Sequence, residues 1–177
     1  MKALVLDTET TGLTSNRVLR IDMQSEIIDF YGCIVDLASG EIESELDLLI
    51  KPKLGIPEKI TKITTITNEM VADAPPFETV APAIQALIES APLAIAHNMA
   101  FDKEVIDIEF QRLGVALNWP HAICTVEQTA HLKGYRLSMS DLHKLLFEAQ
   151  FAGAHRAKVD TAALVRCCVE LHKRAVL

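Results

Sequence analysis

Two carboxylates near the N-terminus have the spacing of a metal site. Asp7 and Glu9 directly follow an apolar run over residues 3–6, and side chains two residues apart on an extended chain point to the same side. Carboxylates held side by side repel each other unless a cation or a proton neutralises them. Oxygen ligands of this kind suit Mg²⁺ or Mn²⁺ rather than zinc. A strand end that is exposed to water could have the same sequence, so a metal site is indicated only if other residues supply further ligands.

Three more polar residues stand near the ends of expected strands and helices, where catalytic side chains are often found. Asp102 follows the apolar run 93–96 and the dipeptide His97-Asn98, and His155 precedes Asp160 by five residues. Five residues correspond to about 140° round a helix, so His155 and Asp160 would not share a helical face. Because Gly153 favours a loop, we expect His155 on a mobile loop and Asp160 in an early helical turn. A loop histidine can take up a proton near neutral pH.

Each of these three residues also has an ordinary structural interpretation. Asp102 is a good helix N-cap, His155 could be a surface loop histidine, and Asp160 could favour a helix dipole from the first turn. Together with Asp7 and Glu9, however, they give four carboxylates and one histidine, all at the ends of expected elements.

The hydrophobic pattern predicts an α/β domain with a mixed sheet covered by helices. A buried strand that ends at Asp7, a strand after it and an alternating, half-exposed strand are expected to form an antiparallel meander. Two short buried strands follow, so five strands are expected, over residues 3–6, 27–35, 42–50, 93–96 and 122–124. Helices are expected over residues 77–89, 102–113, 126–132, 140–147 and 159–173.

Length and composition set the broad class. The 177 residues are half apolar and carry a net charge of −7, which predicts one globular domain over residues 1–177 and excludes a disordered chain. No apolar run approaches the roughly 20 residues of a membrane span, and the N-terminus does not resemble a signal peptide. We therefore expect a cytoplasmic protein. The four cysteines do not have zinc-site spacing and are expected to be buried thiols.

Three segments together resemble a known enzyme family. Residues 5–13 (VLDTETTGL), 96–102 (AHNMAFD) and 155–160 (HRAKVD) are similar to the three motifs of the DEDDh 3′→5′ exonucleases of the DnaQ-like superfamily. A histidine five residues before the last aspartate marks the h subclass. The resemblance covers essentially the whole chain, with further similarity at residues 66–71 and 123–125. Residues 14–25 are longer than usual, and residues 27–32 and 65–67 depart from common family sequences, which leaves substrate preference open.

The resemblance implies a fold, a cofactor and roles for individual residues. The fold would be ribonuclease H-like, a mixed five-stranded sheet with helices on both faces. The site would hold two Mg²⁺ ions, for which Mn²⁺ can substitute, and Asp7 would bind both of them. Glu9 and Asp160 would bind the ion that carries the attacking water. Asp102 would help to bind the other ion. His155 would be the general base. The terminal nucleotide would contact Thr10, Gly12 and Leu13, with Asn98 as a further substrate contact.

The implied reaction removes nucleoside 5′-monophosphates from nucleic acid 3′ ends. We expect single-stranded DNA as the substrate, and a polymerase or another replication or repair protein as a partner. A 3′→5′ exoribonuclease acting on RNA ends or short oligoribonucleotides is the alternative, because the sequence does not show how a 2′-OH would be treated. A stretch of local charge +3 over residues 131–158 is a candidate path for the strand's phosphates.

Two alternative functions from other protein classes also remain. An inactive nucleic-acid-binding module would be expected to lose ligands, whereas all five positions are filled here. A haloacid dehalogenase-type phosphatase also begins with a strand followed by Asp-x-Asp-x-Thr, but position 9 is Glu and no late acidic pair follows. Whether the protein works alone, as a subunit or as an oligomer is not evident from the sequence.

Overall fold

A single five-stranded sheet organises the described part of the chain. The computed structural model describes residues 1–14, 20–151, 153 and 155–177. The strands lie in the order β3-β2-β1-β4-β5 and have the bounds β1 (Lys2–Thr10), β2 (Ile27–Asp36), β3 (Ile42–Leu49), β4 (Leu93–Ala96) and β5 (His121–Cys124). The first three strands pair antiparallel, whereas β4 pairs parallel with β1 and with β5. This confirms the predicted mixed sheet with an initial meander.

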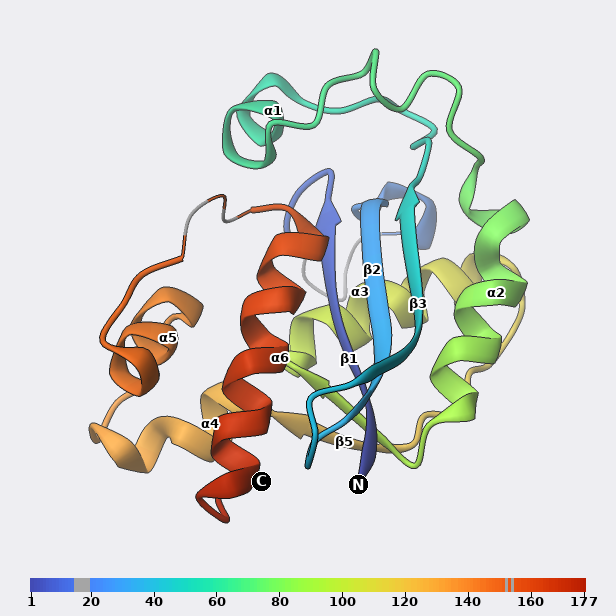
Figure 1. The fold of residues 1–177 in the computed structure, drawn as a ribbon. Helices are drawn as coiled ribbons and strands as arrows, with labels where there is room; N and C mark the ends of the chain where they lie inside the picture. The colour runs from blue at the N-terminus through green and yellow to red at the C-terminus, as the bar shows by residue number, and fades with distance from the viewer. Residues whose placement is uncertain (15–19, 152, 154) are drawn as a thin grey trace.

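Helices cover both faces of the sheet, as predicted (Figure 1). The helices and 3₁₀ turns are η1 (Ile21–Met23), α1 (Glu58–Thr64), α2 (Phe77–Ser90), α3 (Met99–Arg112), α4 (Thr125–Thr129), η2 (Ala130–Leu132), α5 (Met139–Phe147) and α6 (Ala157–Lys173). Buried side chains of α2 and α3 pack with Leu4 and Leu6 of β1, while those of α6 pack with Ala3 and Val5. Even-numbered side chains of β1 therefore face α2 and α3, and odd-numbered ones face α6.

Two predicted boundaries were wrong near the candidate residues. The first strand does not stop at residue 6 but continues to Thr10, because residues 7–9 keep their pairing with β2. Helix α3 begins at Met99 rather than at residue 102. The turn before it is made by Asn98, whose φ of 73° places it in the left-handed region. Asp102 is therefore inside the first turn of α3 and is not its N-cap.

Other expectations of the sequence are confirmed. Cys33, Cys167 and Cys168 are buried and Cys124 is half-buried, and none of them forms a disulfide. The exposed strand β3 lies at the edge of the sheet. No helix in the described ranges is both long enough and apolar enough to cross a membrane.

Candidate metal centre

Three of the predicted acidic residues converge at one point. Asp7 and Glu9 lie on the face of β1 that meets α6, and Asp160 lies in the first turn of α6. One carboxylate oxygen of each lies within 4.8 Å of the others. The alternation of β1 gives Asp7 and Glu9 a common side, as their spacing predicted. Packing of α6 on the same face then brings in Asp160, which is 151 residues from Glu9 along the chain.

Burial raises the pKa of each acid in this group, and for Asp7 and Glu9 the charges of neighbouring acids raise it further. Burial, and then the charges of Asp102 and Glu9, raise the pKa of Asp7 well above its ordinary value. The pKa of Glu9 rises to about 8, through burial and then the charge of Asp160. Within the described ranges no hydrogen-bond donor or cationic side chain is paired with Asp7 or Glu9. Half-buried carboxylates without donors favour either a proton or a cation, and three carboxylates fit a hard divalent ion.

Asp102 approaches the same point from the other side of β1. Thr8 donates to Asp102 Oδ1 from its backbone amide at 3.0 Å and from its hydroxyl at 2.8 Å. Burial raises the pKa of Asp102 to about 7, while the two bonds from Thr8 act in the opposite direction. Asp102 is not one of the three acids within 4.8 Å of one another. It is nevertheless the largest charged influence on the pKa of Asp7.

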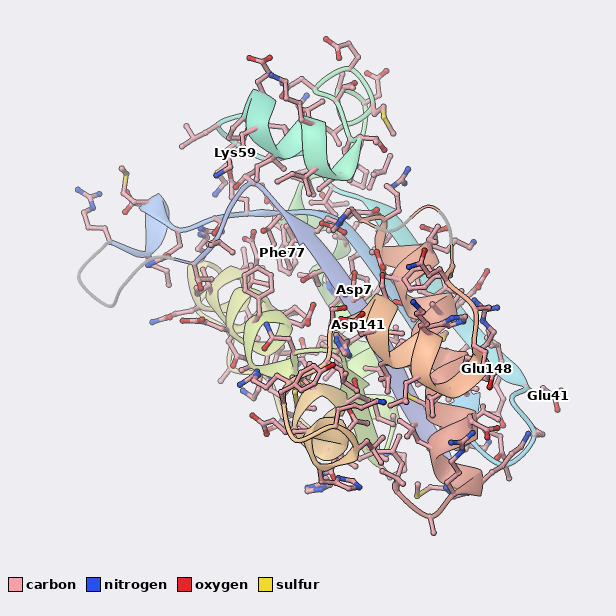
Figure 2. The ribbon with its side chains drawn as sticks, turned by 90° about the vertical axis from the view of Figure 1, so that its left-hand side faces the viewer. Asp7, Glu41, Lys59, Phe77, Asp141 and Glu148 are labelled. Carbon is pink, nitrogen blue, oxygen red and sulfur yellow. The ribbon has the colours of Figure 1, made fainter. Side chains whose placement is uncertain are left out.

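A cleft of about 190 Å³ opens over the acids. Its lining includes His155 together with Met139 of α5 and Leu164 of α6, in addition to Asp7, Thr8, Glu9, His97 and Asp160. In Figure 2, Asp7 lies on β1 between α3 on one side and the C-terminal helices α5 and α6 on the other. The structure therefore brings His155 to the carboxylates of Asp7 and Glu9, although most of the chain separates it from them.

His155 is exposed and lies just before α6, outside the helix, as predicted. Its backbone amide donates to Asp160 Oδ2 at 2.6 Å, and the amide of Arg156 donates to the same oxygen at 3.2 Å. These two bonds partly offset the effect of burial, which raises the pKa of Asp160. Of the loop predicted before His155, residues 152 and 154 lie outside the described residues.

His97 lines the cleft but has both ring nitrogens engaged. Nε2 lies 3.2 Å from the carbonyl oxygen of Leu137, and Nδ1 lies 2.9 Å from the hydroxyl of Thr125. A carbonyl oxygen only accepts, so Nε2 carries the proton and Nδ1 accepts. Burial lowers the pKa of His97, which favours this neutral form. His97 thus joins the end of β4 to the segment before α5.

The predicted substrate contacts differ in their accessibility. Thr10 is buried, and its hydroxyl donates to the carbonyl of Gly12 at 2.5 Å, so that it shapes the turn after β1. Gly12 has open space where a Cβ would be, and the side chain of Leu13 is 84% exposed. Asn98 accepts a hydrogen bond from Arg136 at 3.4 Å. Gly12, Leu13 and Asn98 are therefore open to a ligand, whereas the Thr10 hydroxyl is engaged.

Part of the positive charge expected along residues 131–158 is neutralised within the chain. Arg156 pairs with Asp29 of β2 at 2.9 Å, and Lys158 pairs with Asp47 of β3 at 2.9 Å. Of the five cations in this stretch, these two are paired with carboxylates, although the side chain of Lys158 stays half exposed. The remaining candidates for phosphate contact are Lys133, Arg136 and Lys144.

Two residues near the site were not singled out from the sequence. The orientation of Thr8 could have been predicted from the sequence. Alternate side chains of a strand point to opposite faces, and Thr8 stands between two candidate ligands, so its side chain must lie on the face opposite to theirs. Asp29 is visible only as a polar residue that interrupts an apolar strand. Its pairing with Arg156, 127 residues away, has no local signal.

Comparisons with known proteins agree with these motifs. The RNase_T family model, described as an exonuclease, matches residues 4–167. The chain is 30% identical over 172 residues to a DNA polymerase III PolC-type protein of Caldanaerobacter subterraneus subsp. tengcongensis, covering 95% of this chain and 11% of that protein. It is 32% identical over 131 residues to the DNA polymerase III subunit epsilon of Pasteurella multocida, covering 74% of this chain and 50% of the relative. The chain thus spans about a tenth and about half of these two proteins.

The fold is also found among solved structures. The nuclease domain of 3′hExo, a DEDDh family member bound to rAMP, superposes with a TM-score of 0.78 at 15% sequence identity, covering 98% of this chain and 92% of that one. At this identity the likeness concerns the fold, and it agrees with the ribonuclease H-like architecture predicted from the motifs.

Proposed function

Since the chain belongs to the exonuclease family of DnaQ-like DEDDh enzymes, we propose that it is a metal-dependent 3′→5′ exonuclease acting on DNA. The observation that carries this proposal is the meeting of Asp7, Glu9 and Asp160 within 4.8 Å of one another, in a cleft that His155 also lines. The family requires divalent metal ions, and the donor set found here consists of carboxylates only, which suits Mg²⁺ or Mn²⁺.

The metal-binding roles follow from position. Asp7 and Glu9, with Asp160, would hold one ion, and Asp7 with Asp102 would contribute to a second. Such ions, when bound, lower the pKa of a water and neutralise the charge that develops on the leaving oxygen. Thr8 supports this arrangement by holding Asp102 through two hydrogen bonds. The carboxylates would stay charged in the loaded site, because a divalent cation offsets the burial and the neighbouring charges that now raise the pKa of Asp7 and Glu9.

His155 is proposed as the general base. Its imidazole would take a proton from the attacking water, whose oxygen then forms a bond to the phosphorus of the terminal phosphodiester. The bond from phosphorus to the 3′ oxygen of the preceding nucleotide breaks, and that oxygen takes up a proton. The products are a nucleoside 5′-monophosphate and a strand shorter by one nucleotide. His97, whose two ring nitrogens are engaged, does not compete for this role.

The helix directions support binding of a phosphate at this cleft. Helices α3, α5 and α6 begin at Met99, Met139 and Ala157, close to cleft-lining residues. A helix N-terminus carries a partial positive charge that favours anions. Three such ends round the acids reduce the repulsion that a phosphate would meet in a chain of net charge −7.

DNA is the proposed substrate because both curated relatives are named as DNA polymerase III proteins. A polymerase or another replication or repair protein is correspondingly the proposed partner. RNA is the second candidate, and the solved nuclease domain bound to rAMP favours it. A site distinguishes the two by how it receives the 2′-OH.

The test is a degradation assay on matched single-stranded DNA, duplex DNA and RNA oligonucleotides. Each substrate carries a 5′ label, and the protein is assayed with Mg²⁺, with Mn²⁺ and with a chelator. We expect a ladder of products shortened one nucleotide at a time in the presence of metal, release of 5′-monophosphates, and faster cleavage of single-stranded DNA than of RNA. Faster cleavage of RNA would favour the exoribonuclease, and 3′-phosphate products would contradict the proposed direction of bond breakage.

Variants link the activity to the residues of the site. Asp7→Asn removes a proposed ligand and is expected to abolish cleavage while the protein stays folded. His155→Ala is expected to lower kcat by about 10²–10⁴-fold, as loss of a general base does, with Mn²⁺ binding by calorimetry close to that of the wild type. Full activity in either variant would reject the assignment.

A further inference from the structure

An ion pair between the buried Asp29 and the partly exposed Arg156 ties the segment around His155 to the sheet. Arg156 Nε donates to Asp29 Oδ2 at 2.9 Å, and the backbone amide of Ala157 donates to the same oxygen at 3.3 Å. Asp29 is 1% exposed, and its other oxygen, Oδ1, has no hydrogen-bond partner among the described residues. A buried carboxylate is costly unless it is paired. The two donors therefore fix Asp29, and Asp29 in turn fixes residues 156 and 157.

This pair lies directly beside the acidic group, on the same face of the sheet. Asp29 on β2 is the cross-strand partner of Glu9 on β1. Arg156 directly follows His155, and the amides of both residues donate to Asp160. The turn from 155 to 157 is thus held on one side by Asp160 and on the other by Asp29. Neither Asp29 nor Arg156 lines the cleft itself.

The backbone at His155 needs such support. Its φ of 71° lies in the left-handed region, which is disfavoured for residues with a Cβ. A residue other than glycine keeps this conformation only where its surroundings determine it. The hydrogen bonds described above are the surroundings that the structure shows for this turn. If they were lost, His155 would relax toward ordinary backbone angles and its side chain would leave its present direction.

We propose that Asp29 and Arg156 are positioning residues, which hold the left-handed turn at His155 and so direct its imidazole into the cleft. This inference rests on the proposed role of His155 as the general base. It assigns no chemistry to Asp29 or Arg156, which act through the histidine. It also explains why a carboxylate is buried in the middle of an otherwise apolar strand.

The first test measures the turn without any substrate. Hydrogen exchange of the His155 and Arg156 amides is followed by NMR in the wild type, in Asp29→Asn and in Asp47→Asn. Asp47 of β3 is the matched control because it also pairs with a cation at the start of α6, namely Lys158. The Asp47 side chain is 42% exposed, and an exposed ion pair contributes little to stability. We expect exchange at least about tenfold faster in Asp29→Asn and unchanged in Asp47→Asn. Equal exchange in Asp29→Asn and the wild type would overturn the proposal.

The second test asks whether Asp29 acts through His155. Asp29→Asn is assayed alone and combined with His155→Ala. We expect kcat to fall about 10–100-fold in the single variant, as for residues that orient a functional group, with KM nearly unchanged and with no further loss in the His155→Ala background. A residue with a merely structural role would lower activity equally in both backgrounds, and that result would contradict the proposal. Arg156→Lys keeps the positive charge and should recover part of the activity lost in Arg156→Gln.

These measurements separate the two proposals. If the wild type cleaves no nucleic acid, the proposed function fails, while the exchange experiment still decides whether Asp29 holds the turn. If Asp29→Asn does not fold, as judged by circular dichroism, Arg156→Gln takes its place with the same expected exchange and kinetics. The Arg156 side chain is partly exposed, and in this variant Asp29 still accepts a hydrogen bond from the backbone amide of Ala157.

Discussion

Thr8 donates to a single oxygen of Asp102 from both its backbone amide and its hydroxyl. The two residues are 94 positions apart, and the parallel pairing of β1 with β4 brings the start of α3 beside β1. Thr8 stands between Asp7 and Glu9, with its side chain on the opposite face of the strand. One strand therefore supplies two acids to the cleft and, from the residue between them, orients a third.

Thr8→Val tests this orientation. The variant keeps the shape and the amide donor but removes the hydroxyl, so the charged form of Asp102 loses one hydrogen bond and its pKa should rise further. We expect the affinity for Mn²⁺, measured by calorimetry, to fall about tenfold. Thr8→Ser retains the hydroxyl and serves as the control. Equal affinities in the valine and serine variants would show that the hydroxyl does not matter.

The stability of the metal-free protein should depend on pH through Glu9. Its pKa is about 8 in the folded protein, raised from 4.5, so between these values the folded state keeps a proton that the unfolded state releases. Stability therefore falls as pH rises through this window. Thermal unfolding in a chelating buffer should show Tm decreasing from pH 5 to pH 8, and added Mn²⁺ should oppose the decrease. Glu9→Gln should flatten the dependence, and an unchanged slope in that variant would assign the effect to other groups.

Leu13 offers a test of how the terminal nucleotide is held. Its side chain is 84% exposed in the turn after β1, where a base could pack on it. Leu13→Ala is expected to raise KM for an oligonucleotide several-fold, since each CH₂ group that is removed from water by packing on a base contributes about 0.8 kcal/mol, with a smaller change in kcat. Leu54→Ala is the matched control, because Leu54 is 83% exposed on another segment. The prediction fails if the two variants have the same KM.

Arg112 should matter for stability rather than for catalysis. Arg112 and Glu109 form an ion pair at 2.8 Å with side chains only 9% and 5% exposed, and Arg112 also donates to backbone carbonyls of residues 21, 24 and 25. Arg112→Met leaves Glu109 buried without its partner, so the free energy of unfolding should fall by about 3–5 kcal/mol. The control Arg174→Met breaks the exposed pair with Glu170 and should cost less than about 1 kcal/mol. Denaturant titration measures both.

The sequence predicted the site more fully than it predicted the boundaries of the elements. Asp7 and Glu9 share a side because strand alternation acts locally, whereas their meeting with Asp160 and His155 depends on the packing of α6 on β1 and was expected from the resemblance of the three motifs. Asp102 was placed correctly near a helix start, but the left-handed turn at Asn98 starts α3 earlier. The pairing of Asp29 with Arg156 depends on the packing of α6 across the sheet, which no local pattern encodes. The single domain and the cytoplasmic location stay predictions.

The groups that line and support this cleft are widely separated in sequence, which has a consequence for biosynthesis. Thr8 and Asp102 are 94 residues apart, and Asp29 and Arg156 are 127 residues apart. Contacts of such high sequence separation form late, because a long loop must close before they are made. A nascent chain that has left the ribosome only as far as α3 lacks Asp160 and His155 altogether. Nuclease capacity would therefore arise only after α6 has docked, so that unfinished or misfolded copies pose no threat to the nucleic acids around them.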